Sequence, residues 1–265
     1  MLYLSNLVTG LDNGLDDPGY LMRAADAAQA GIEFFLHAHS PEYRDKVTAI
    51  PTWLAGRPCT THGPFIGVEA ASRPHTAEHE HMLDAYRWAF DAAAMLGSRH
   101  MVFHTNQRVI EHSELPQAQA DCMNSIEELL RMAEPYNIQL LIENLGIQKK
   151  GVCLFDEDAF IALFDRFPQA GCIIDTGHLN VAGWSAQRVL SALSSRIEAY
   201  HFHNNDGVSD SHLPISSGTF DYCAFMPLYH RYTPHASVTL EYGDVPPVPC
   251  ERVAHDLCTV RGWLL

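Results

Sequence analysis

The chain has 265 residues, of which 47% are hydrophobic and 18% charged, a balance that excludes a disordered protein and suits one large domain or two small ones. It carries 32 acidic and 17 basic residues, a formal charge of −15. A field of that sign repels nucleic acid, so we expect no nucleic-acid partner.

The same composition bears on where the protein works. No apolar run approaches the roughly 18 residues of a membrane span, and the first residues lack the basic and apolar regions of a signal peptide. The seven cysteines form no CxxC pair, a pattern typical of reduced thiols. We therefore expect a cytoplasmic protein with no membrane partner.

Short apolar runs alternate with longer amphipathic stretches along the whole chain. The runs predict eight strands, at 2–8, 32–38, 59–65, 99–105, 138–144, 172–178, 198–204 and 237–243. The amphipathic stretches predict helices at 18–31, 41–55, 75–97, 116–137, 156–167, 185–195 and 249–263, with the least regular pattern at 221–231. Gly97 ends one helix and Pro116 opens the next, as is usual for these residues.

Eight strands alternating with helices over this length predict a single (β/α)8 barrel, a TIM barrel, spanning residues 1–265. The alternative is a doubly wound open sheet, which usually carries a glycine-rich phosphate loop after its first strand. No GxGxxG spacing follows the first predicted strand, and this absence favours the barrel.

Metal-binding residue types gather where the predicted strands end, which in a barrel is the mouth that forms the active site. By strand alternation Glu143 shares a face with Leu141 and Glu241 with Thr239, so both carboxylates are expected inside the barrel. The candidate ligands are His62, His104, Glu143, Asp175, His178, His201, Asp210, His212 and Glu241.

Each of these residues also has a purely structural interpretation. A lone histidine at a strand end can simply be hydrogen bonded, and Asp175 can cap the following helix. However, Glu143, Asp175 and Glu241 would converge with no lysine or arginine in their strands, and a divalent cation would offset their repulsion. Mixed imidazole and carboxylate ligands suit zinc, manganese, iron or cobalt, and nine donors are too many for one ion.

Four stretches resemble the xylose isomerase-like barrel superfamily, which holds sugar isomerases and epimerases together with apurinic endonucleases of the endonuclease IV type. They are LLIENLG (140–146), IIDTGHLNVAG (173–183), HFHNNDGVSDSHLP (201–214) and TLEYGD (239–244). The resemblance implies one divalent ion, Zn²⁺ or Mn²⁺, with His178 beside it and the ligands Glu143, Asp175, His201 and Glu241. The endonuclease branch implies up to three ions, with further ligands at His62, His104, His178, Asp210 and His212.

The sequence departs from the family pattern in three places. Asn204 stands where an acidic residue is common, and Ser216-Ser217 replaces a Gly-Glu pair before Gly218. The arginine that epimerases carry near the position of Gly207 is missing, so substrate binding is expected to differ from theirs.

Two chemistries remain open. In an isomerase or epimerase of a small sugar or polyol, the ion would stabilise an enediolate while Glu143 and Glu241 accept and donate a proton. His178 would hold a substrate hydroxyl. This is the function we expect, with further substrate contacts from His203, His37, Arg108 and Lys149.

In a phosphodiesterase acting at abasic sites, Glu143 would instead bridge two ions, and Phe65 with Ile66 would form a base-unstacking wedge. That activity needs a basic track, for which the mouth-side loops offer only Arg44, Arg108, Lys149 and Lys150. A third possibility is a non-catalytic barrel that keeps the metal as a structural element.

Two other sets of residues are expected to be structural. His75, His79 and His81 are predicted on the exposed polar face of a helix, because no HExxH order is present. Cys59 and Cys172 are predicted as small core residues.

Overall fold

The computed structural model is a closed barrel of eight parallel strands, in which β1 pairs with both β2 and β8. It describes residues 1–10, 15–16, 18–37, 40–145, 151–243 and 248–265. The strands are β1 Leu2–Ser5, β2 Gly31–Phe35, β3 Cys59–His62, β4 His100–Phe103, β5 Gln139–Glu143, β6 Gly171–Asp175, β7 Ile197–Phe202 and β8 Ser237–Leu240. The predicted (β/α)8 fold is confirmed.

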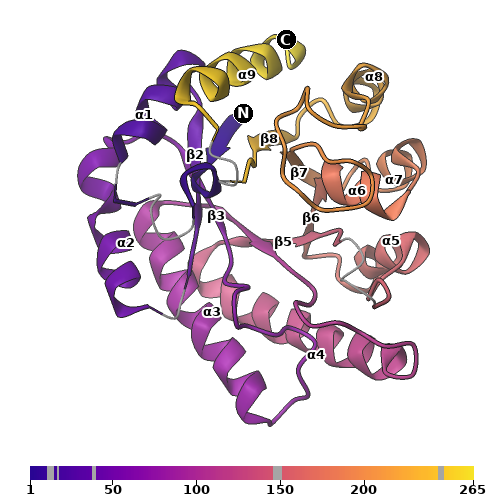
Figure 1. Ribbon diagram of the computed structural model, residues 1–265. Coiled ribbons are helices and arrows are strands. Elements are labelled where there is room, and N and C mark those ends of the chain that lie inside the picture. The colour runs from indigo at the N-terminus through magenta and orange to yellow at the C-terminus, as the bar shows by residue number, and fades with distance from the viewer. Residues whose placement is uncertain (11–14, 17, 38–39, 146–150, 244–247) are drawn as a thin grey trace.

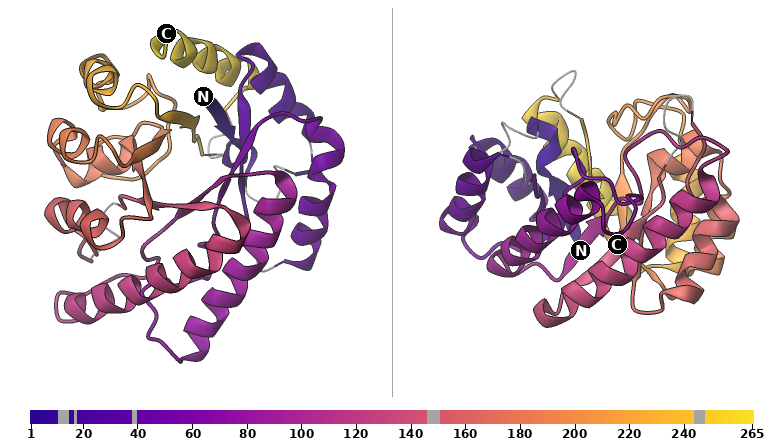
Figure 2. Two further views of the ribbon diagram at one scale, coloured as in Figure 1. Left: turned by 180° about the vertical axis from the view of Figure 1, so that it is seen from behind. Right: turned by 90° about the horizontal axis from the view of Figure 1, so that it is seen from below.

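Helices form an outer ring around the strands, seen along the barrel in Figure 1 and from behind and below in Figure 2. They are α1 Pro18–Ala27, α2 Pro41–Leu54, α3 Ala77–Leu96, α4 Leu115–Ala133, α5 Glu157–Arg166, α6 Thr176–Ala182, α7 Ala186–Ala192, α8 Tyr222–Tyr232 and α9 Cys250–Trp263. Two 3₁₀ turns, Asn6–Thr9 and Glu134–Tyr136, add to them. α9 packs beside α1. None of the helices in the described part of the chain is long and apolar enough to cross a bilayer.

The principal difference from the predicted elements lies after β6. The strand expected at 172–178 ends at Asp175, because the Asp175 carboxylate accepts a hydrogen bond from the backbone N–H of His178 at 2.6 Å. That bond caps α6, a short helix that periodicity did not predict. Asp175 therefore both caps a helix and faces the barrel mouth.

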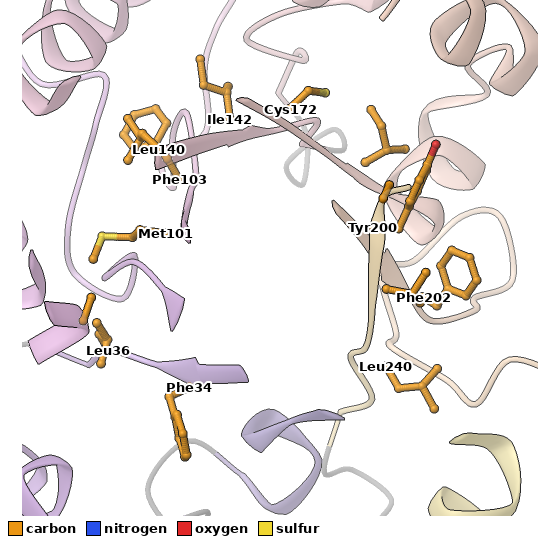
Figure 3. Close-up of a cluster of buried hydrophobic side chains, with 14 of the residues drawn as sticks. Phe34, Leu36, Met101, Phe103, Leu140, Ile142, Cys172, Tyr200, Phe202 and Leu240 are labelled. Carbon is orange, nitrogen blue, oxygen red and sulfur yellow. The ribbon is translucent and has the colours of Figure 1, made fainter. Parts of the chain in front are cut away.

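Alternation along the strands divides the core into two layers. Side chains on the outer face of the barrel pack against the helices, as Figure 3 shows for Phe34, Phe103, Tyr200 and others. Cys172 is buried in this layer, as predicted, and Cys59 is half-buried against it. A separate cluster fills the inside of the barrel: Val102, Leu141, Ile173 and Ala199. Because Glu143 follows Leu141 by two residues, its carboxylate lies directly above this inner layer.

Candidate metal centre

Six histidines and five carboxylates form one largely buried cluster at the C-terminal ends of the strands, with Asp210 at its exposed edge. Among the described residues they fall into five groups of three, and within each group the potential ligand atoms lie within 4.8 Å of one another. All nine residues predicted as metal ligands belong to the cluster, which the structure extends by His203 and Glu33. The structure thus brings the predicted ligands together, and their binding of a metal stays a prediction.

Glu143 lies at the centre of this cluster and contacts four imidazoles. Its Oε2 is 2.9 Å from Nε2 of His104 and 3.6 Å from Nε2 of His62. Its Oε1 is 3.3 Å from Nδ1 of His178 and 3.4 Å from Nδ1 of His201. One carboxylate therefore serves two different groups of nitrogens, a geometry that allows it to bind one ion or to bridge two.

Nδ1 of His201 is surrounded by the other ligands predicted for a single ion. It lies 3.4 Å from Glu143 Oε1, 3.8 Å from Asp175 Oδ2 and 3.3 Å from Glu241 Oε2. Residues from β5, β6, β7 and the end of β8 thus converge on one nitrogen. These four residues would be the ligands of a single divalent ion at this position.

The loop after β7 brings two further candidate ligands, Asp210 and His212, over the mouth. Asn204 and Leu213 exchange backbone hydrogen bonds at 2.8 and 2.7 Å, which folds the intervening residues back on the barrel. Asp210 Oδ2 then lies 3.1 Å from Nε2 of His178 and 3.3 Å from Nε2 of His212. His212 has a φ of 44°, in the left-handed region that non-glycine residues rarely adopt. The loop therefore holds His212 in an uncommon conformation beside Asp210 and His178.

The orientation of the rings fits a bound cation. Nδ1 of His62 donates to the carbonyl oxygen of Gly63 at 2.8 Å, and Nδ1 of His212 to that of Glu241 at 3.0 Å. Each ring thereby turns Nε2 into the cluster, as metal-binding histidines do. Oε2 of Glu143 and Nδ1 of His178 are buried without a well-aligned hydrogen-bond partner among the described residues. A metal ion would satisfy both atoms.

The carboxylates of the cluster favour the protonated form of two of its rings, His178 and His212. Burial lowers the pKa of His178, but the Asp175 and Asp210 carboxylates outweigh it and hold that pKa well above its usual value. Burial is likewise outweighed at His212, where the hydrogen bond to Asp210 raises the pKa to about 9. Metal binding replaces such protons, so the donor set fits a divalent cation.

The two glutamates of the site differ in their environments. Burial raises the pKa of the Glu143 carboxyl, but His104 and His201 outweigh it and hold the pKa well below its usual range. Burial is the larger effect at Glu241, whose pKa is raised although His201 and His212 oppose the change. Burial also lowers the pKa of His104 to about 4, against the attraction of Glu143. The two glutamates therefore differ in the direction of their pKa shift, because different histidine rings face them.

A cavity of about 680 Å³ opens onto the cluster, within the range of small-molecule sites. Its polar lining includes His62, Glu143, Asp210 and Glu241, and its apolar lining includes Phe65. No lysine or arginine is among the described residues that line it. Phe65, considered above as a wedge, packs against the rings of Phe35, His62 and His104 at 5.4, 5.3 and 4.9 Å between centroids.

Two of the predicted substrate contacts, His203 and Arg108, do not line this cavity. His203 is fully buried, with Nε2 2.9 Å from Asp175 Oδ2, and its ring stacks on His212 at 3.9 Å. Arg108 pairs with Glu114 at 3.1 Å. Neither side chain is among the residues that line the cavity. His203 thus holds the Asp175 carboxylate, and Arg108 has a carboxylate partner of its own.

Of the other mouth-side residues considered, His37 meets Tyr43 edge-on at 5.7 Å and does not line the cavity. Arg44 lies over the ring of Trp88, 5.0 Å from its centroid. Lys149 and Lys150 lie outside the described residues.

Two interpretations of the sequence need amendment. His75, His79 and His81 were expected on the exposed face of one helix. This was wrong for His79, which is buried, and for His75, which lies before α3 begins at Ala77. His79 is 1% exposed, and its Nε2 is 3.4 Å from Glu128 Oε1. The ring faces inward because His79 precedes the buried residues Met82, Leu83 and Tyr86 by three, four and seven positions and so lies on the same face of α3. Glu33 belongs to the cluster but was not predicted from the sequence. A single charged residue inside the apolar strand GIEFF was the signal that could have identified it.

Comparison with known proteins agrees with this geometry. The family model of the xylose isomerase-like TIM barrel matches residues 21–255. The chain belongs to that family, which confirms the resemblance seen in its motifs.

Individual relatives are distant. The chain is 21% identical over 131 residues to an inosose isomerase of Bacillus licheniformis, a match that covers 48% of this chain and 46% of that protein. The matched stretch thus spans about half the length of this curated relative. A D-tagatose 3-epimerase-like protein superposes with a TM-score of 0.78 at 18% identity, covering 99% and 96% of the two chains. The IolI protein with a bound zinc atom superposes with a TM-score of 0.73 at 14% identity, covering 98% and 96%. These structures show the shared fold.

Proposed function

We propose that this protein is a divalent-metal-dependent isomerase or epimerase of a small, uncharged sugar or polyol. The observation that carries the proposal is the pair Glu143 and Glu241, both buried and both lining a small-molecule cavity whose described lining contains no lysine or arginine. A substrate without a phosphate needs no such cation. The inosose isomerase and the tagatose-epimerase-like protein support the same class of substrate.

The residues that would hold the ion are Glu143, Asp175, His201 and Glu241, and the mixed donor set suits Zn²⁺ or Mn²⁺. The zinc bound by the IolI protein supports this choice. When bound, such an ion supplies Lewis acidity that polarises a carbonyl and the adjacent hydroxyl of the substrate.

The chain itself moves the proton. Glu143 and Glu241 approach Nδ1 of His201 from different strands, at 3.4 and 3.3 Å. One carboxylate removes the proton from the carbon beside the carbonyl, and the other returns a proton to the neighbouring position or to the opposite face. His178, which also lines the cavity, holds a substrate hydroxyl. Phe35 and Phe65 form an apolar wall that limits access of water.

The test is hydrogen exchange. The metal-free protein is reloaded with Zn²⁺ or Mn²⁺ and incubated in D₂O with a panel of ketohexoses and inososes, and ¹H NMR follows each C–H beside a carbonyl. We expect exchange that requires both the metal and Glu143. Absence of exchange across the panel, with every substrate recovered unchanged, would contradict the proposal.

A phosphodiesterase is the second candidate, because two further groups adjoin the four-ligand site, one of them sharing Glu143 with it. They are His62–His104–Glu143 and His178–Asp210–His212, each compact enough to hold an ion. Three ions per chain by elemental analysis, together with metal-dependent cleavage of an abasic duplex, would favour this function. Because the described cavity lining lacks the cations that a phosphate backbone needs, we expect no cleavage at ~0.15 M salt.

A further inference from the structure

Glu33 is a buried carboxylate that neither the sequence motifs nor the proposed chemistry uses. It lies in the middle of β2, is 1% exposed, and has apolar neighbours on both sides in the chain. Its Oε1 is 2.9 Å from Nε2 of His201, and its Oε2 accepts a hydrogen bond from Thr239 Oγ1 at 3.2 Å. An isolated charge would be costly at this depth, and the two contacts offset part of that cost.

The contact with Glu33 determines which nitrogen of His201 carries hydrogen. A neutral imidazole has one N–H and one lone pair, and a carboxylate facing Nε2 keeps the N–H on that nitrogen. The lone pair is then on Nδ1, the atom that Glu143, Asp175 and Glu241 surround. A ring with the opposite tautomer would present a hydrogen to these ligands and could not bind a cation.

We propose that Glu33 is a positioning residue that holds His201 in the Nε2–H tautomer and so makes Nδ1 a metal ligand. This inference rests on the metal site of the proposed function, but not on the reaction performed there. His62 and His212 are oriented by backbone carbonyls, whereas His201 has a full negative charge as its partner. That charge increases the basicity of Nδ1 as well as orienting the ring.

Glu33 could alternatively ligate an ion itself, since it forms a compact group with His201 and Glu241. The geometry argues against this role. Oε1 lies against Nε2, on the far side of the ring from Nδ1, and Oε2 is engaged by Thr239. If Glu33 were a ligand, replacing it would reduce the number of bound ions. If it is a positioning residue, replacing it lowers the affinity and leaves the number of ions unchanged.

The experiment compares Glu33→Gln and Glu33→Ala with a matched control, Thr239→Val, which removes the second contact of the carboxylate and leaves the first. Zinc affinity is measured by competition with a chromophoric chelator, and bound zinc is counted at saturation. We expect Glu33→Ala to weaken zinc binding about 10- to 100-fold. Glu33→Gln should lose less, because its amide oxygen still accepts the N–H, and Thr239→Val less again.

A spectroscopic readout separates positioning from a general loss of stability. In the zinc-loaded protein, ¹⁵N–¹H correlation spectra should show His201 as the Nε2–H tautomer, assigned with a His201→Gln variant. Glu33→Gln should retain this signature. Zinc affinity changed less than two-fold in both Glu33 variants, or one fewer ion at saturation, would overturn the proposal. Should Glu33→Ala fail to fold, Glu33→Gln alone decides. If Glu33→Gln then loses the Nε2–H signature of His201 but binds zinc as tightly as the parent protein, the proposal is overturned. Failure of the exchange assay with these zinc results intact would refute the isomerase function alone.

Discussion

Gly177 is the glycine of α6 that packs against the site, and replacing it with alanine tests the packing of His203. An added Cβ would lie 2.0 Å from Cε1 and 2.5 Å from Nδ1 of the His203 ring. That ring has no free direction in which to move, because it is fully buried, bonded to Asp175 at 2.9 Å and stacked on His212 at 3.9 Å. Gly177→Ala must therefore displace the ring and release Asp175.

The cost follows from three contributions. Overpacking a buried site costs about 1–3 kcal/mol, and losing a hydrogen bond to a charged group about 1.5–3 kcal/mol. Alanine regains about 1 kcal/mol because it favours the helix over glycine. The free energy of unfolding should thus fall by about 1.5–5 kcal/mol, which at about 2–4 °C per kcal/mol lowers Tm by about 3–20 °C.

The assay is calorimetric unfolding of the metal-free protein, with Gly262→Ala as the matched control. Gly262 also lies in a helix, α9, but a Cβ there would meet nothing within 4 Å. The control should be unchanged or slightly more stable, and only Gly177→Ala should also weaken zinc binding, through Asp175. A Tm for Gly177→Ala equal to that of Gly262→Ala would refute the reasoning, because the ring would then have yielded without cost.

Three further outcomes are expected. Glu143→Gln and Glu241→Gln should each slow substrate proton exchange by about 10²- to 10⁴-fold while metal is retained, because glutamine offers an oxygen ligand but accepts no proton at neutral pH. If either variant exchanged substrate protons in D₂O as fast as the parent protein, the role of that glutamate would be contradicted. His104→Ala and His212→Ala should each reduce the zinc content at saturation by one ion if the outer groups are occupied, and elemental analysis that finds one ion in both variants and in the parent protein would exclude a polynuclear site. Removal of the metal with a chelator should lower stability by about 2.7 kcal/mol relative to protein at an ion concentration 100 times Kd, and identical melting curves would show that no ion is held.

Much of the fold and of the site could be predicted because the relevant signals are local. Alternation between short apolar runs and amphipathic stretches is set by residues a few positions apart, and it predicted the closed barrel. The period of two along a strand placed Glu143 on the face of Leu141, and the structure has Glu143 directly above the inner layer that contains Leu141. In a parallel barrel the C-terminal ends of all strands lie at the same mouth. The candidate ligands were therefore expected to lie close together although they are far apart in the chain.

Only the tertiary structure decided which partner each side chain takes. Arg108 lies on a mouth-side loop, yet its guanidinium pairs with Glu114. His203 follows His201 by two residues, yet it holds Asp175 instead of lining the cavity. Glu33 meets His201, 168 residues away in the chain, only because closure of the barrel brings the side chains of β2 and β7 together in its interior. Periodicity determines the face on which a side chain lies, but the distance between two charged atoms depends on rotamers and loop paths that the whole fold sets.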